Sequence, residues 1–142
     1  MKNILIINGP NLNKLDIREK EIYGSITLES IEKKCKSVGK ELGLKVDFFQ
    51  SNSEGGIIDK IQDSIGKIDG IIINGGAYTH TSIAIMDALL SFKKPIIEVH
   101  ISNIFKREDF RQVSYISRAA NGVICGLGIS SYTSALHAIA EF

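Results

Sequence analysis

The stretch from Asn8 to Gly24 holds the side chains best suited to chemistry in this chain. It reads NGPNLNKLDIREKEIYG, and it follows the apolar run from Ile4 to Ile7, which is typical of a buried strand. In open α/β sheets, ligands bind beyond the carboxyl ends of the strands. Because this loop carries amides, the guanidinium of Arg18 and the phenol of Tyr23, it indicates chemistry on an oxygen-rich, anionic small molecule.

Three further polar segments are expected at the same edge of the sheet: 74–82, 98–103, and a short helix carrying Arg107 and Arg111. The two arginines are four residues apart, a spacing that places them on one helical face. Together with the opening loop, these segments are predicted to converge at the carboxyl edge of the sheet.

Glu98 and His100 are two residues apart on an expected strand, so they share a face. A carboxylate beside an imidazole orients the ring and raises its basicity, as a general acid or base requires. His80 also falls at a strand–loop junction. The alternative is that these histidines are structural and that Glu98 and His100 form a simple ion pair at the edge of the sheet.

Other kinds of site have weaker support in the sequence. His80, Glu98, His100 and Asp87 can supply metal ligands, but the chain has no H-E-x-x-H motif and no close His/Cys spacing, so we expect no metal site. It also lacks the G-x-S-x-G motif of serine hydrolases and the G-K-[ST] of a phosphate-binding loop.

Composition narrows the class of protein. The chain has 142 residues, 44% of them hydrophobic, so one domain spanning residues 1–142 is expected. A net charge of +1 argues against nucleic-acid binding or an anionic membrane surface, and no apolar run is long enough for a membrane span. Cys35 and Cys125 lie far apart in apolar segments, so we expect buried free thiols and a cytoplasmic protein.

Short apolar runs alternate with helical periodicity along the whole chain. Strands are predicted at 3–8, 45–50, 70–74, 96–99 and 122–126, and helices at 28–42, 56–65, 82–92, 107–112 and 131–142. Thr27 is the expected N-cap of the first helix, and Gly43 its stop. Continuous apolar strands indicate a parallel sheet covered on both faces, with a flavodoxin-like, doubly wound order 2-1-3-4-5.

The predicted helix 82–92 is apolar on nearly every side, although a surface helix normally keeps a polar face. This pattern predicts either deep burial in the domain or a subunit interface. Asp87 is the single charge within it, and a buried carboxylate should meet a cation or a hydrogen-bond donor.

The loop motifs together resemble those of type II 3-dehydroquinate dehydratase. They are NGPNLNKL…RE…YG, QSNSEG, NGGAYTHTSIAIMDAL, IEVHISN…R…FR and GVICGLGISSY, in order over nearly the whole chain. The resemblance implies a flavodoxin-like fold and a homododecamer built as a tetramer of trimers. It also implies cofactor-free dehydration of 3-dehydroquinate to 3-dehydroshikimate in the shikimate pathway, through an enolate.

The resemblance assigns the chemical steps to five residues. It implies that Tyr23 removes a proton next to the substrate ketone and that Arg18 lowers the pKa of that phenol. Asn11 positions a water that stabilises the enolate. His100, held by Glu98, protonates the departing hydroxyl.

The resemblance also implies which residues bind the substrate. Asn74 and the backbone at Ile101 and Ser102 hold the carboxylate, while His80 and Arg111 bind the ring hydroxyls. Asp87 reaches the site of a neighbouring subunit, and Arg107 matches an arginine of the active-site lid.

The sequence departs from the usual family pattern at Asp16, Lys20 and Gly75, none of which is an expected catalytic position. The alternative function is a flavodoxin-like small-ligand binding domain without catalysis. A receiver domain would need acidic residues after the first strand, where this chain has Asn8-Gly9-Pro10.

Overall fold

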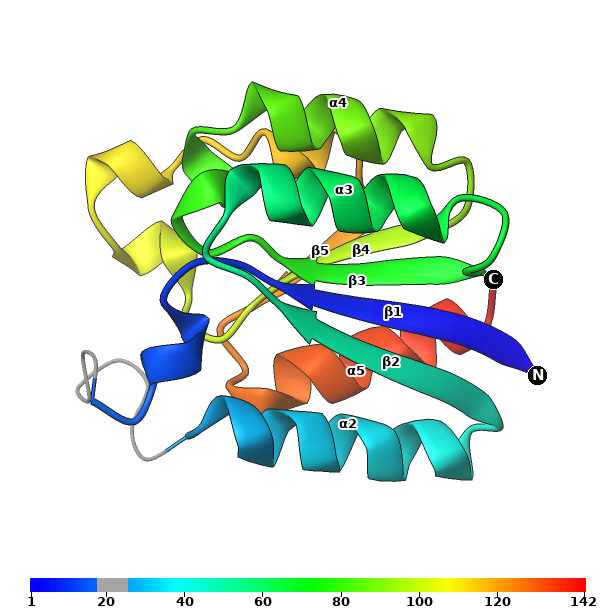
Figure 1. The fold of residues 1–142 in the computed structure, drawn as a ribbon. Helices are drawn as coiled ribbons and strands as arrows, with labels where there is room; N and C mark the ends of the chain where they lie inside the picture. Colours follow the sequence, from blue (N-terminus) through cyan, green and yellow to red (C-terminus); the bar gives the residue numbers. More distant parts are fainter. Residues whose placement is uncertain (18–25) are drawn as a thin grey trace.

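The computed structural model of the protein describes residues 1–17 and 26–142. One parallel sheet forms its centre, with strand order β2-β1-β3-β4-β5, which confirms the predicted topology (Figure 1). The strands are β1 Lys2–Asn8, β2 Leu44–Gln50, β3 Gly70–Asn74, β4 Ile96–His100 and β5 Gly122–Cys125.

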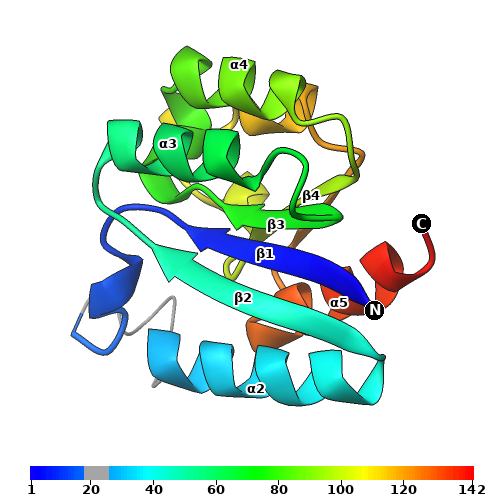
Figure 2. The same ribbon diagram turned by 45° about the vertical axis from the view of Figure 1, so that its right-hand side comes forward.

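Helices cover both faces of the sheet. α2 (Leu28–Glu41) and α5 (Ile129–Ala140) lie on one face, and α3 (Glu54–Ser64) and α4 (Ile83–Ser91) lie on the other (Figures 1 and 2). Side chains of β1 alternate between the two layers. Ile4 and Ile6 pack on the α2–α5 side, while Leu5 and Ile7 pack on the α3–α4 side. This two-sided burial is the reason that the strand sequences are continuously apolar.

Local hydrogen bonds fix the helix ends. Thr27 caps α2 in a reciprocal capping box: its hydroxyl accepts from Ser30 N, and Ser30 Oγ accepts from Thr27 N, both at 3.1 Å. Gly43 follows the helix with φ +72°, as its predicted role as a stop requires. α3 begins two residues earlier than predicted, because Ser53 Oγ accepts from Gly56 N and caps the first turn.

The predicted helix at 107–112 is wrong in type. The structure has a single 3₁₀ turn there, η4 (Asp109–Arg111), which follows another, η3 (Ile104–Lys106). Arg107 lies between the two turns, so the four-residue helical spacing of the arginines does not apply.

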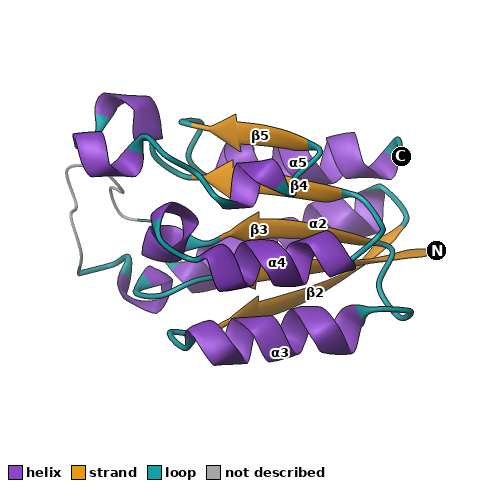
Figure 3. Cartoon of the chain, turned by 90° about the horizontal axis from the view of Figure 1, so that it is seen from above, coloured by secondary structure: helices purple, strands orange, loops and turns teal. Residues whose placement is uncertain are grey.

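The carboxyl ends of β1 and β3 meet at one edge of the sheet, where the loops gather (Figure 3). Asn8 pairs in register with Asn74, and Gly9 N donates to Asn74 O at 2.8 Å. A Cβ on Gly9 would lie 2.3 Å from the carbonyl oxygen of Gly75. The repeated Ile-Ile-Asn-Gly sequence thus ends two adjacent strands whose backbones are in close contact.

α4 is buried on one side only. Ile85 and Leu89 are fully buried, whereas Ile83 and Leu90 are 53% and 47% exposed. Asp87 is also exposed, so within one chain it is not a buried carboxylate. Deep burial of the whole helix is likewise excluded within one chain, which leaves an apolar surface on α4.

Candidate active site

A pocket opens at the carboxyl edge of β3 and β4. It contains about 360 Å³ of empty space, including its open mouth. Six of the predicted site residues line it: Asn74, His80, His100, Ile101, Ser102 and Arg111. Its other lining residues are Leu12, Gly76, Ala77, Ile104 and Arg107. The predicted convergence of loop segments is therefore confirmed for these positions.

His100, which lines this pocket, forms a buried pair with Glu98. Nε2 of His100 lies 2.5 Å from Oε2 of Glu98. The Glu98 side chain is fully buried, and His100 is only 5% exposed. The predicted same-face arrangement on β4 is thus a direct contact, with Nε2 donating to the carboxylate.

Two serines complete the surroundings of the Glu98 carboxylate. Ser114 Oγ lies 3.0 Å from both carboxylate oxygens, and Ser117 Oγ donates a short hydrogen bond to Oε1. Burial acts to raise the pKa of Glu98, but the hydrogen bonds from His100, Ser117 and Ser114 outweigh it, so this pKa falls below its ordinary value. Glu98 is therefore an anion at neutral pH. The sequence reasoning missed both serines, which lie in a loop without periodic pattern.

His80 has a fixed tautomer. Its Nδ1 lies 2.8 Å from the carbonyl oxygen of Val113, which can only accept, so Nδ1 carries the proton. Burial lowers the pKa of His80, and the hydrogen bond to Val113 opposes that shift only in part. The neutral ring then has an acceptor at Nε2. It stacks on the ring of His100, with centroids 6.3 Å apart.

Asn74 is held by hydrogen bonds on both sides of its amide. Its Oδ1 accepts from Gly76 N at 3.2 Å, and its Nδ2 donates to the hydroxyl of Tyr132 at 2.9 Å. Asn74 is 3% exposed, yet it lines the pocket. Sequence reasoning missed Tyr132, although a buried tyrosine on an apolar helix signals a polar partner for its hydroxyl.

Arg107 and Arg111 bring positive charge to the pocket. Their side chains are only 9% and 15% exposed. Glu108 Oε1 lies 2.9 Å from Nε of Arg111 and 3.7 Å from Nε of Arg107, and it is about half exposed. Glu108 at the rim accepts a hydrogen bond from Arg111 and lies within ion-pair distance of Arg107, and the two cations suit the pocket to an anionic ligand.

Three predicted site residues that the structure describes are not among those that line the pocket: Asn11, Glu98 and Asp87. Glu98 lies behind His100, with which it is hydrogen-bonded. Asn11 is exposed on the loop after β1, where its backbone has φ +68° and its N–H donates to Asn52 Oδ1 at 3.0 Å. Asp87 is exposed on α4. Arg18 and Tyr23 lie outside the described residues.

Residues 1–17 and 26–142 contain no group of three His, Cys, Asp or Glu side chains that could hold a metal ion. None of the helices described there has the length and apolar character of a membrane span.

Comparisons with known proteins show the family of this chain. The family model described as dehydroquinase class II matches residues 2–140. The chain belongs to this family. A 3-dehydroquinate dehydratase of Endomicrobium trichonymphae is 62% identical over 136 residues, covering 96% of this chain and 95% of that protein.

Solved class II dehydroquinases share the fold. The type II dehydroquinase of Butyrivibrio crossotus DSM 2876 superposes with a TM-score of 0.95 at 48% identity, over 97% of each chain. That of Propionibacterium acnes gives a TM-score of 0.96 at 42% identity, over 100% of this chain and 98% of the other. The dehydroquinase match spans every predicted site residue, including the two outside the described ranges.

Proposed function

We propose that this protein dehydrates 3-dehydroquinate to 3-dehydroshikimate without a cofactor. Membership of the dehydroquinase family and relatives named 3-dehydroquinate dehydratase support this reaction. The observation that carries it is the buried His100–Glu98 pair, which faces a pocket lined by Asn74 and two arginines. Such a pocket combines a proton donor with groups that bind an anion.

The substrate carries a carboxylate and several ring hydroxyls. We assign the carboxylate to Asn74 and the backbone at Ile101 and Ser102, which adjoin one another in the pocket. His80 accepts from a ring hydroxyl through Nε2, because Val113 fixes the proton on Nδ1. Arg111, which lines the same pocket, binds a ring hydroxyl oxygen.

His100 acts as the general acid. Because its Nε2–H is hydrogen-bonded to Glu98, Nδ1 is the nitrogen that transfers a proton to the departing hydroxyl, which leaves as water. The anionic Glu98 stabilises the imidazolium before transfer and keeps the ring oriented after it. The C–O bond breaks as the enolate collapses to the conjugated enone.

Tyr23 acts as the general base that forms this enolate. A free tyrosine has a pKa of about 10, and one nearby cation lowers a pKa by roughly one to three units. Arg18 therefore lowers the pKa of the Tyr23 phenol toward neutral pH, and a further hydrogen bond to the phenolate completes the shift. Asn11 positions the water that donates to the enolate oxygen, where one preorganised donor is worth about 3 kcal/mol.

Product analysis by mass spectrometry tests this function against the binding-domain alternative. Wild-type protein incubated with 3-dehydroquinate should yield a product lighter by one water, and Tyr23→Phe should not. Saturable binding of 3-dehydroquinate with no product from the wild type would support a non-catalytic flavodoxin-like domain instead.

We also propose that residues 1–142 form one domain that assembles as a homododecamer in the cytoplasm. The exposed Ile83 and Leu90 on α4 support a subunit interface on this helix. Asp87 lies on the same helix, so the interface would bring its carboxylate toward a neighbouring site. Asp87 would then bind substrate in that neighbour.

A further inference from the structure

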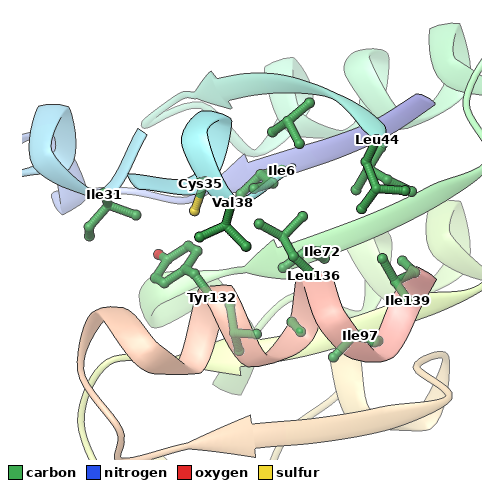
Figure 4. Close-up of a cluster of buried hydrophobic side chains, with 14 of the residues drawn as sticks. Ile6, Ile31, Cys35, Val38, Leu44, Ile72, Ile97, Tyr132, Leu136 and Ile139 are labelled. Atoms are coloured by element: carbon green, nitrogen blue, oxygen red, sulfur yellow. The ribbon is translucent and has the colours of Figure 1, made fainter. Parts of the chain in front are cut away.

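A chain of buried hydrogen bonds links the ends of β1 and β3 through α5. Tyr132 is fully buried in the core between α5 and the sheet, beside Val38 and Leu136 (Figure 4). Its hydroxyl donates to Asn8 Oδ1 at 2.7 Å and accepts from Asn74 Nδ2 at 2.9 Å. Asn8 is also fully buried.

The direction of each hydrogen bond that joins Asn8, Tyr132 and Asn74 is determined by its neighbours. Asn8 Nδ2 lies 3.2 Å from the carbonyl oxygen of Phe49, which only accepts, so Asn8 must present its oxygen to Tyr132. The Tyr132 hydroxyl has one proton and gives it to that oxygen. Only its lone pairs then remain for Asn74, whose NH₂ group must face it.

The N–H of Gly76 imposes the same orientation from the other side of the Asn74 amide, because it needs the oxygen there. A flipped amide would place its NH₂ against that N–H and its oxygen against a hydroxyl whose proton is committed to Asn8. Both contacts would be repulsive, and buried polar groups without partners are costly.

We propose that Tyr132 is a positioning residue for substrate binding that acts through Asn74. Its hydroxyl accepts a hydrogen bond from one N–H of the Asn74 amide, and this directs the other N–H to the ligand in the pocket. This inference rests on the proposed role of Asn74 in binding the substrate carboxylate. Tyr132 itself is not one of the described residues that line the pocket.

A double-mutant cycle in the full-length protein tests this coupling. Tyr132→Phe should raise KM about five- to twentyfold with little change in kcat, as expected for one disturbed hydrogen bond. In an Asn74→Ala background, Tyr132→Phe should leave KM unchanged. Equal effects of Tyr132→Phe on KM in both backgrounds would overturn the proposal. Tyr115→Phe, which removes a hydroxyl from a half-buried tyrosine elsewhere, is the matched control.

Two further results separate the possible failures. If Asn74→Ala leaves KM unchanged, the assignment of Asn74 to substrate is wrong; absence of turnover by the wild type would instead reject the proposed function. If Tyr132→Phe does not fold, NMR of the wild type decides. One Asn74 side-chain amide proton should exchange slowly with solvent, and rapid exchange of both would contradict the fixed orientation.

Discussion

Nε2 of His100 lies 2.5 Å from Oε2 of Glu98, within a single strand. The two residues are separated by one position, so the pleat of β4 directs both side chains to the same face. The carboxylate is completely buried and also accepts hydrogen bonds from two serine hydroxyls. One short strand thus supplies both the imidazole and the anion that orients it.

Glu98→Gln should lower kcat without unfolding the protein, because the amide keeps the shape of the side chain but cannot stabilise an imidazolium. We expect a loss of kcat of about 10²-fold, within the range for general acid–base groups. Steady-state kinetics with 3-dehydroquinate measure it. Glu141→Gln, at an exposed position, is the control and should be neutral. Equal kcat for Glu98→Gln and wild type would show that His100 does not need the carboxylate.

In Ser117→Ala, the free energy of unfolding should vary less with pH in the acid range than it does in the wild type. The pKa of Glu98 is lower in the folded protein than its unfolded value of about 4.3. Ionisation of Glu98 therefore stabilises the fold at pH values above about 4.3, and this stabilisation is lost as the pH falls through the folded-state pKa. Removing a donor to the carboxylate should cost about 1.5–3 kcal/mol at pH 7 and less at acid pH. Urea unfolding at several pH values tests this, and a pH-independent loss would contradict it.

Arg111→Ala should raise KM about tenfold or more, because the guanidinium is largely buried at a pocket expected to bind an anion. Initial rates over a range of substrate concentrations provide the measurement. Arg118→Ala removes the same charge from an exposed site outside the pocket and is the matched control. Similar KM values for both variants would place the substrate away from Arg111.

Gly9→Ala should destabilise the fold, because the added Cβ would lie 2.3 Å from the backbone oxygen of Gly75. Overpacking against backbone costs typically about 1–3 kcal/mol. Gly122→Ala is the matched control, since a Cβ there meets nothing within 4 Å. Thermal unfolding should show a clearly lower Tm for Gly9→Ala than for Gly122→Ala. Equal Tm values would mean that the two strand ends can separate freely.

Leu90→Glu should disrupt assembly if α4 forms a subunit interface. Light scattering of the wild type should give the mass of twelve chains of 15.6 kDa, and the variant a smaller particle. Ile65→Glu is the control, because Ile65 is similarly exposed but lies after α3. A dodecamer that persists in Leu90→Glu would place the contacts elsewhere, and a monomeric wild type would reject the assembly.

Much of the fold follows from local pattern. Continuous apolar runs such as Ile4–Ile7 predict buried parallel strands, and Thr27 and Gly43 predict the ends of α2. The contact between Glu98 and His100 was predictable for the same reason, since the period of a strand is two residues.

Other features depend on tertiary contacts that have no sequence period. Ser114 and Ser117 reach Glu98 from a loop, and no spacing relates them to β4. The arginine segment folds as separate 3₁₀ turns, so helical spacing misplaces Arg107 relative to Arg111. Exposure of Asp87 depends on how α4 packs on the sheet, which a helix that is apolar on nearly every side does not specify.

The most direct test is a continuous ultraviolet assay of purified protein with 3-dehydroquinate, in the presence of a chelator. The conjugated enone of the product absorbs where the substrate does not. The account predicts a rise in absorbance that is insensitive to chelator and is lost in Tyr23→Phe. No rise from folded wild-type protein, or a rise that chelator abolishes, would contradict cofactor-free dehydration.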